Sequence, residues 1–333
     1  MSASRAGHQR MEAVVQEGYG ESDVLELREI DIPSIGRGEV LVEVRATAVD
    51  NGVWHLMTGV PYATRIFGFG LRAPKQPIRG LDLAGVVVAL GADVSGFDVG
   101  DEVFGTGTGT FAEYAVSRPE LLAPKPSGVT FEQAAATPNS AFTALQALRD
   151  AGRLVTGQRV LVIGANGGVG SFAVQIAVAL GAVVTGVCRG TNTAMVRSLG
   201  ASDVIDYEID DCTDGTRTWD LILDTGGNRP VDALRRALTP TGTLVIVGSE
   251  TDGRWLGGTG RQMSAQALSP LIRQNLVGVM AKPNRHDLSV IGALLASGEV
   301  VPQLGDVFPL AEAAAAVDRV RAGDARGKVI LVP

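Results

Sequence analysis

The segment "VLVIGANGGVGSFAVQ" (160–175) passes from an apolar, strand-like run through a glycine-rich turn into a helix-like run. The dinucleotide-binding fingerprint Gly-x-Gly-x-x-Gly fits here with Ala165 in the place of its first glycine. Such glycines allow the backbone to approach a pyrophosphate, which the N–H groups at the helix N-terminus then bind. The segment therefore predicts a dinucleotide-binding turn, formed by Ala165, Asn166, Gly167, Gly168, Val169 and Gly170.

Strand-like and helix-like segments alternate on both sides of this turn. The predicted strands are 159–164, 182–187, 203–207, 219–227 and 243–248, and the predicted helices are 168–180, 193–200 and about 231–238. Alternation of this kind indicates a parallel, doubly wound sheet with helices on both faces. We therefore expect an α/β domain of the Rossmann type.

The first hundred residues instead have the texture of β structure. Strand-like runs at 39–49, 83–91, 100–105 and 111–116 are separated by glycine and aspartate turns. Prolines then precede a helix that Ser127 or Thr130 can cap, which puts a domain boundary near residue 126. We therefore predict a β-rich domain over 1–126, a dinucleotide-binding domain over 127–284, and a segment over 285–333 whose strand 327–333 returns to the first domain.

Composition narrows the function classes. The net charge of −7 argues against a general nucleic-acid binder. The two cysteines, Cys188 and Cys212, offer no disulfide framework, so a cytoplasmic location is expected. Residues 161–188 lack charge, but their clustered glycines fit buried strands and a turn better than a membrane span.

The end of the second predicted strand bears on the choice of cofactor. NAD-binding sites place Asp or Glu there to bind the ribose 2′-hydroxyl, whereas this chain has Arg189, and the first acid after the turn is Asp203. An arginine would pair with a 2′-phosphate, and Asn192 and Tyr207 could add hydrogen bonds. This pattern favours NADPH, although Arg189 as a solvated loop residue remains an alternative.

Several of these stretches together resemble one family. "GQRVLVIGANGGVGSFAVQIA" is similar to the quinone-oxidoreductase signature of the medium-chain dehydrogenase/reductase superfamily, and "GLDLAGVVVALGADVSGFDVGDEVFG" resembles its GroES-like domain. Asn166 and Val178 depart from the signature's usual serine and basic residue. The resemblance implies a GroES-like catalytic domain, a Rossmann domain and a cleft between them. It also places Thr143 beside the nicotinamide carboxamide.

The resemblance is to the zinc-independent branch. Asp50 stands at the position of the catalytic cysteine of the zinc-dependent relatives, and "GLDLAG" (80–85) replaces their histidine-glutamate motif. The four closely spaced cysteines of a structural zinc lobe are absent from the sequence. We therefore expect no metal site.

Three residues are candidates for the catalytic chemistry. Asp50 could interact with the oxidised nicotinamide. His55, Tyr62, the cofactor ribose hydroxyl or water could donate to the oxygen of the developing enolate. Structural roles remain open for each: a turn cap for Asp50, a wall residue for His55 and a loop residue for Tyr62. The predicted cofactor contacts also include Thr225, Gly248 and Lys328.

The segment between Asp50 and Asp82 contains no acid but accumulates Arg65, Arg72, Lys75 and Arg79. Aromatic residues interleave with these cations. The segment is interpreted either as a flap attractive to anionic or aromatic compounds or as a solvated loop over packed aromatics.

These inferences converge on a zinc-independent, NADPH-dependent oxidoreductase that reduces quinones or α,β-unsaturated carbonyl compounds. A reductase of simple carbonyls and a dinucleotide-binding redox sensor with little turnover remain alternatives. We expect a homodimer, with 275–281 as the edge strand that could pair two sheets, and neither nucleic acid nor membrane as a partner.

Overall fold

The computed structural model describes residues 9–62, 65–227, 229–247, 259–323 and 325–333. Contacts divide the chain into two compact units. The first consists of Met1–Gly59, Thr64–Pro138 and Leu304–Pro333, and the second of Val60–Ala63 and Asn139–Gln303. No helix within the described ranges is long and apolar enough to cross a membrane.

A six-stranded sheet forms the centre of the second unit. Its order is β10-β9-β8-β11-β12-β13, and every neighbouring pair is parallel. The strands are β8 (Arg159–Ile163), β9 (Val183–Cys188), β10 (Asp203–Asp206), β11 (Trp219–Asp224), β12 (Leu238–Val247) and β13 (Asn275–Val279). This is the strand order of the doubly wound dinucleotide-binding fold, so the predicted fold class is confirmed.

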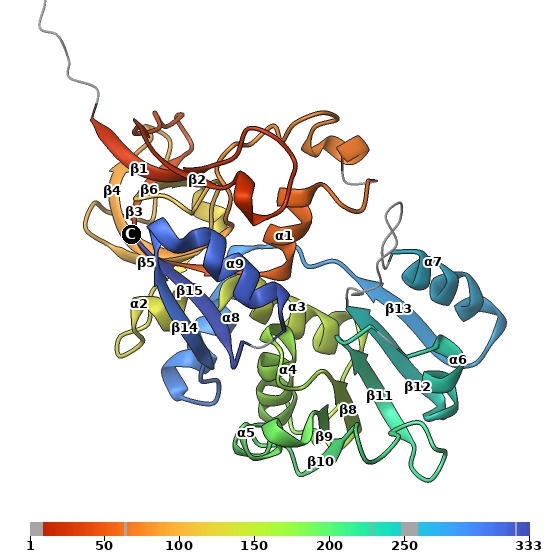
Figure 1. Cartoon of the computed structure of the whole chain (residues 1–333). Helices are drawn as coiled ribbons and strands as arrows, with labels where there is room; N and C mark the ends of the chain where they lie inside the picture. The colour runs from red at the N-terminus through yellow and green to blue at the C-terminus, as the bar shows by residue number, and fades with distance from the viewer. Residues whose placement is uncertain (1–8, 63–64, 228, 248–258, 324) are drawn as a thin grey trace, which may run out of the picture. The chain divides into compact units, whose positions relative to one another are not determined.

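Helices accompany this sheet in the second unit (Figure 1). They are α3 (Pro138–Gln146), α4 (Gly168–Ala179), α5 (Thr193–Ser198), α6 (Val231–Arg236), α7 (Thr259–Leu268) and α8 (Arg285–Ser297). Helix α4 contacts β8 and β9, α5 contacts β9 and β10, α6 contacts β12, and α7 contacts β13. The sheet's apolar side chains are buried, among them Leu161, Ile222 and Leu244. Parallel strands that are covered on both faces have no solvent-exposed face.

The first unit is built mainly on antiparallel strands, while β14 and β15 pair in parallel. A seven-stranded sheet runs β14-β15-β3-β4-β5-β7, with β6 paired to β3, and β1 pairs with β2 separately. The strands are β1 (Arg10–Val15), β2 (Glu26–Asp31), β3 (Val40–Val49), β4 (Asp82–Leu90), β5 (Glu102–Thr106), β6 (Tyr114–Ser117), β7 (Leu122–Pro124), β14 (Leu304–Pro309) and β15 (Lys328–Val332). Strand β15 pairs antiparallel with β3, which joins the end of the chain to this sheet.

Two segments explain where the units divide. Helix α2 (Phe131–Ala135) begins at the capping residue Thr130 and packs on β3 and β4, so the division falls at Pro138, later than residue 126. Helix α8 stays with the second unit because its buried Asp287 accepts hydrogen bonds from Arg149 and Gln146. The second division therefore falls after Gln303 and not near residue 285.

The first unit also contains a helix that the sequence pattern did not reveal. Helix α1 (Asn51–Thr58) starts after Asp50 and ends at Gly59, whose φ of +62° is left-handed. Its Val53 and Met57 are buried against α9 (Ala313–Arg321) and the end of β3. A helix of this length is marginal by itself, so the packing of its apolar residues against neighbouring elements of the first unit stabilises it.

Candidate functional site

The glycine turn joins β8 to α4 and takes its sharpest bend at Gly164. Gly164 has φ +79°, and a Cβ on it would lie 2.6 Å from the hydroxyl oxygen of Thr225. That hydroxyl donates a hydrogen bond to the carbonyl of Ile163, with 2.7 Å between the oxygens. The tight-turn glycine of the fingerprint therefore stands one position before Ala165.

Ala165 has a packing reason to be an alanine. Its side chain is fully buried, and its N–H donates to the carbonyl of Val187 on β9 at 3.0 Å. A Cβ on Gly186 would approach the Ala165 methyl to 3.1 Å, so the methyl fills the space above a glycine of the next strand. The alanine fits the turn without loss of the bend.

The last two glycines of the fingerprint, Gly167 and Gly170, have different structural roles. A Cβ on Gly170 would collide with the carbonyl oxygen of Gly164, so only glycine lets α4 pack this closely on the turn. Gly167 is the exposed N-cap of α4, and a Cβ there would meet only the Gly164 carbonyl oxygen, at 3.2 Å.

The N-terminus of α4 fits a dinucleotide. The first turn of α4 carries no acidic residue, and the N-cap side chain is missing because residue 167 is glycine. The helix therefore presents its amide groups and the positive end of its dipole at the carboxyl edge of the sheet. Asn166 is half-buried beside Gly167, and Gly168 and Val169 begin the helix. These residues would hold the pyrophosphate.

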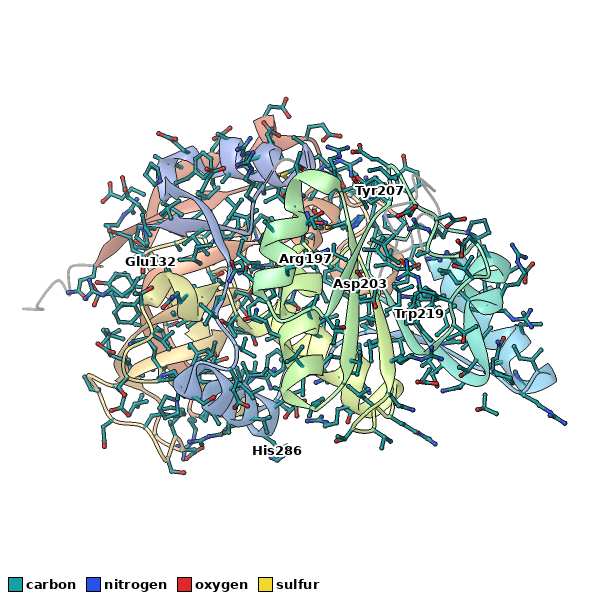
Figure 2. The ribbon with its side chains drawn as sticks, turned by 90° about the horizontal axis from the view of Figure 1, so that it is seen from below. Glu132, Arg197, Asp203, Tyr207, Trp219 and His286 are labelled. Carbon is teal, nitrogen blue, oxygen red and sulfur yellow. The ribbon has the colours of Figure 1, made fainter. Side chains whose placement is uncertain are left out.

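Arg189 lies directly after β9, and its side chain is 55% exposed. The nearby Tyr207 and Glu208 raise the pKa of its guanidinium. The N–H of Asn192 donates to the Arg189 carbonyl at 2.8 Å. Parallel pairing of β10 with β9 brings Tyr207 alongside, and Figure 2 labels Tyr207. The structure therefore brings together the three residues predicted to surround the adenosine ribose.

Two acidic residues near Arg189 were not evident from the sequence pattern. The guanidinium Nε of Arg189 lies 3.1 Å from the carboxylate Oε1 of Glu208, and a Cβ on Gly190 would collide with the carboxylate of Asp206. Asp206 ends β10, where it pairs with Cys188 of β9, and Glu208 follows two residues later. The acid expected at the end of the second strand of an NAD site is thus absent, and acids lie at and just after the end of the third strand.

The candidate catalytic Asp50 and the candidate cofactor ligand Lys328 contact each other. The Lys328 ammonium forms a salt bridge with the Asp50 carboxylate, and it lies 3.9 Å from an oxygen of Asp82. The side chains of Lys328 and Asp82 are 3% and 0% exposed. A buried cation therefore stands between two carboxylates.

The other predicted site residues lie in separate surroundings. His55 is on α1, with its ring 5.1 Å from that of Trp54, and Tyr62 is half-buried beyond Gly59. The Thr143 hydroxyl on α3 donates to the carbonyl of Asn139 at 2.8 Å. Gly248 lies outside the described residues.

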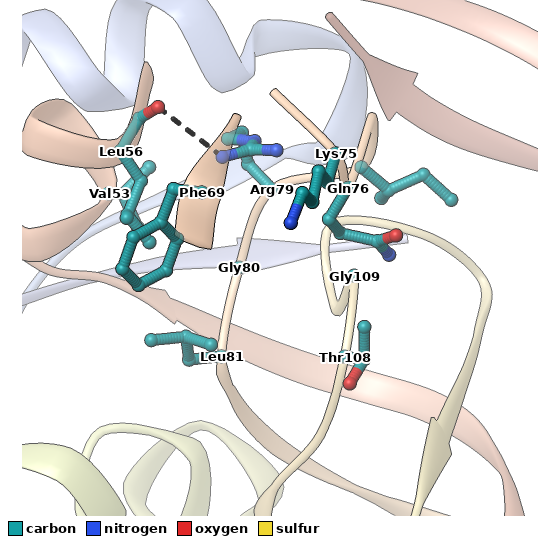
Figure 3. A pocket seen from close by; sticks show the side chains of 11 residues that line it. Val53, Leu56, Phe69, Lys75, Gln76, Arg79, Gly80, Leu81, Thr108 and Gly109 are labelled. Atoms are coloured by element: carbon teal, nitrogen blue, oxygen red, sulfur yellow. Dashed lines mark hydrogen bonds between the residues drawn. The ribbon is translucent and has the colours of Figure 1, made fainter. Parts of the chain in front are cut away.

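The cationic segment after α1 borders a cavity of about 270 Å³ (Figure 3). Arg79 and Lys75 line it, and Arg79 is only 6% exposed. Burial lowers the pKa of Arg79. Arg65 turns elsewhere: its guanidinium lies 4.2 Å from the centre of the Tyr19 ring and donates to the carbonyls at the end of α1.

The described residues contain neither a cluster of side chains suited to a metal ion nor an exposed thiol. No group of three or more His, Cys, Asp or Glu side chains there could hold a metal ion. Cys188 and Cys212 are free and buried, and burial raises the pKa of both thiols.

The chain is similar to dehydrogenases and oxidoreductases in its family matches, its sequence relatives and its structural neighbours. Residues 36–127 match the family "Alcohol dehydrogenase GroES-like domain", and residues 199–331 match "Zinc-binding dehydrogenase". The chain is 31% identical to the human (Homo sapiens) "NAD(P)H oxidoreductase RTN4IP1, mitochondrial", over 96% of this chain and 89% of that protein. It is 29% identical to "Quinone-oxidoreductase QR1, chloroplastic" from Triphysaria versicolor, over 97% and 98%. The solved quinone oxidoreductase from Coxiella burnetii superposes with a TM-score of 0.83 at 26% identity, covering 98% of this chain and 100% of that one.

Proposed function

Because this chain belongs to the quinone oxidoreductase branch of the medium-chain dehydrogenase/reductase superfamily, we propose that it is a zinc-independent oxidoreductase that uses NADPH to reduce quinones or α,β-unsaturated carbonyl compounds. Membership in this branch makes the chain an NAD(P)H-dependent oxidoreductase. The preference for NADPH, the independence from zinc and the class of acceptor form the proposal.

The glycine turn and Arg189 carry the cofactor half of the proposal. The turn has the shape that a pyrophosphate needs, with the Gly164 bend and the open N-terminus of α4. Arg189 follows β9, where an NAD site would carry an acid, and its planar guanidinium suits a 2′-phosphate. Asn192 and Tyr207 are close enough to add hydrogen bonds. When bound, the nicotinamide would supply a hydride to the acceptor.

The Lys328–Asp50 salt bridge supports zinc-independent chemistry. Asp50 and Asp82 are engaged by a buried ammonium, so neither carboxylate is arranged as an open metal ligand. An acceptor that already carries an electron-withdrawing carbonyl needs no Lewis acid at the carbon that receives the hydride. His55 and Tyr62 are the proposed donors to the oxygen where negative charge develops.

We further propose a cytoplasmic homodimer. Strand β13 forms one edge of the parallel sheet, and Met280 directly after it is 84% exposed. An open strand edge with an exposed apolar side chain is a natural place for two sheets to pair. Sedimentation of the purified protein with and without Met280→Glu tests this part, and a monomeric wild-type protein would contradict it.

A substrate panel tests the activity. The purified protein is mixed with NADPH and, separately, with quinones, enones and aldehydes, and the loss of NADPH absorbance is followed. The proposal expects turnover with a quinone or an enone. Turnover with aldehydes alone would indicate a simple carbonyl reductase, and tight NADPH binding without turnover would indicate a redox sensor.

A further inference from the structure

Residues of α1 form one wall of the cavity beside this helix, and loop residues form another. Its lining combines apolar side chains with a few polar groups, and Figure 3 shows Arg79 and Lys75 on the same side of it. Val53, Leu56 and Leu81 give the lining its apolar side chains, and Lys75 and Arg79 give it two cations. At about 270 Å³ it is close to the smallest volumes typical of small-molecule sites.

Arg79 is the unusual member of this lining. Its side chain is 6% exposed, and Nε and Nη2 are both buried without a hydrogen-bond acceptor among the described residues. The third nitrogen, Nη1, makes a long hydrogen bond of 3.4 Å to the carbonyl of Leu56. Buried guanidinium nitrogens normally have partners, so two orphans on one side chain point to a missing acceptor.

The electrostatic surroundings do not neutralise this cation. The carbonyl end of α1 gives a partial negative charge, but burial outweighs the effect of Tyr19 and lowers the pKa of the Arg79 guanidinium. The cavity lining contains no carboxylate, and Lys75 adds a second positive charge to it. The sequence from 51 to 81 also contains no acid. A buried charge in this setting is costly until an anion pairs with it.

The identity of the two orphan nitrogens narrows the class of anion. In a guanidinium, the N–H groups of Nε and Nη2 point the same way along one edge of the plane. That edge matches the two oxygens of a carboxylate, which it binds through two parallel hydrogen bonds. Val53, Leu56 and Leu81 then face whatever is attached to the carboxylate, and they favour an apolar body.

We propose that this cavity binds a small carboxylic acid with an apolar body, with Nε and Nη2 of Arg79 holding the two carboxylate oxygens and Lys75 supplying a second positive charge. The site lies wholly within the first unit. Binding there requires neither the dinucleotide nor turnover.

Calorimetric titration of the full chain tests the site with phenylacetate and its neutral isostere phenylacetamide. We expect saturable binding of phenylacetate that weakens with added salt, and binding of the amide at least about tenfold weaker because it cannot accept at both oxygens. Equal binding of acid and amide, or no binding of either, would overturn the proposal. Binding of sulfate as tight as that of phenylacetate would show a general anion site, which also contradicts it.

Matched variants connect the binding to Arg79. Arg79→Met should lose phenylacetate binding, whereas Arg72→Met should keep it, because Arg72 is an exposed arginine of the same segment outside the cavity. Without ligand, Arg79→Met should unfold at the wild-type temperature or higher, since the removed cation has no anionic partner. Retained phenylacetate binding in Arg79→Met would overturn the assignment. If that variant does not fold, Lys75→Met decides: binding as tight as in the wild type contradicts the proposal.

Discussion

Arg189 and Glu208 form an ion pair of 3.1 Å just beyond the parallel strands β9 and β10. Both side chains are about half exposed, so water and salt screen the pair, and it is easily opened. Without a cofactor, the Arg189 guanidinium is therefore paired with Glu208, and a 2′-phosphate would compete with this weak ion pair. The pair suggests that Glu208 tunes how strongly the site distinguishes the phosphorylated cofactor.

Arg189→Ala should weaken NADPH binding by about tenfold or more and change NADH binding little, because only the phosphorylated cofactor offers an anion to this guanidinium. Fluorescence titration of both cofactors measures the two dissociation constants. Arg197→Ala, an exposed arginine on α5, serves as the control and should leave both unchanged. Equal losses for the two cofactors in Arg189→Ala would remove this residue from the 2′-phosphate site.

Glu208→Gln should strengthen NADPH binding by a few fold, since the competing carboxylate is replaced by a neutral amide of the same size. The gain should shrink at high salt, where the original ion pair is already screened. Titration with NADPH at low and high ionic strength measures this difference. An unchanged or weaker affinity at low salt would show that the ion pair positions Arg189 for the phosphate instead of competing with it.

Gly170→Ala and Gly167→Ala should separate folding from cofactor binding. The first places a methyl against the Gly164 carbonyl and should lower the free energy of unfolding by about 1–3 kcal/mol. The second adds an exposed methyl and should change that free energy by less than about 0.5 kcal/mol, while weakening dinucleotide binding. Urea unfolding and cofactor titration of both variants provide the measurements. A Gly167→Ala protein with unaltered affinity would place the pyrophosphate elsewhere.

Lys328→Met should lower the free energy of unfolding by about 3–5 kcal/mol, because it removes a buried cation from Asp50 and Asp82. Adding Asp50→Asn should recover part of this loss by removing one of the uncompensated charges. Chemical denaturation of the single and double variants gives the coupling energy. Strictly additive losses would mean that the two side chains do not stabilise each other.

Asp287 should contribute a pH-dependent part of the stability. Burial acts to raise its pKa, but hydrogen bonds from Arg149, Asn284 and Gln146 outweigh burial, and the pKa is lowered. The folded state therefore prefers the charged carboxylate. Its contribution is present above the unfolded pKa of about 3.9 and is lost as the pH falls through the lower, folded value.

Urea unfolding at a series of acidic pH values should show this loss for the wild-type protein. Asp287→Asn should be less stable at neutral pH and should depend less on pH in the acid range. Parallel pH profiles for the two proteins would exclude Asp287 as a source of the dependence.

The glycine turn and the alternation of strands and helices could be predicted because both signals are local. A bend at Gly164 and an open N-cap at Gly167 follow from a dozen neighbouring residues. Helix α1 was missed because its eight residues carry a weak pattern and depend on buried contacts from distant strands.

The charge pairs of the candidate site could not be predicted from neighbouring residues. Lys328 and Asp50 are 278 positions apart, and only the pairing of β15 with β3 brings them together. Glu208 reaches Arg189 through the register of two parallel strands. Arg79 stands in a polar stretch that is typical of an exposed loop, and its burial depends on contact with α1.

The contact between Ala165 and Gly186 limits how this turn can be altered. A methyl at 186 would press on the Ala165 methyl and collide with the Val196 side chain, while a glycine at 165 would leave a small void beneath the turn. An engineer who restores the consensus glycine at 165 therefore gains no sharper bend, because Gly164 already makes it. The two positions share one volume, and redesign of this cofactor loop should vary them as a pair.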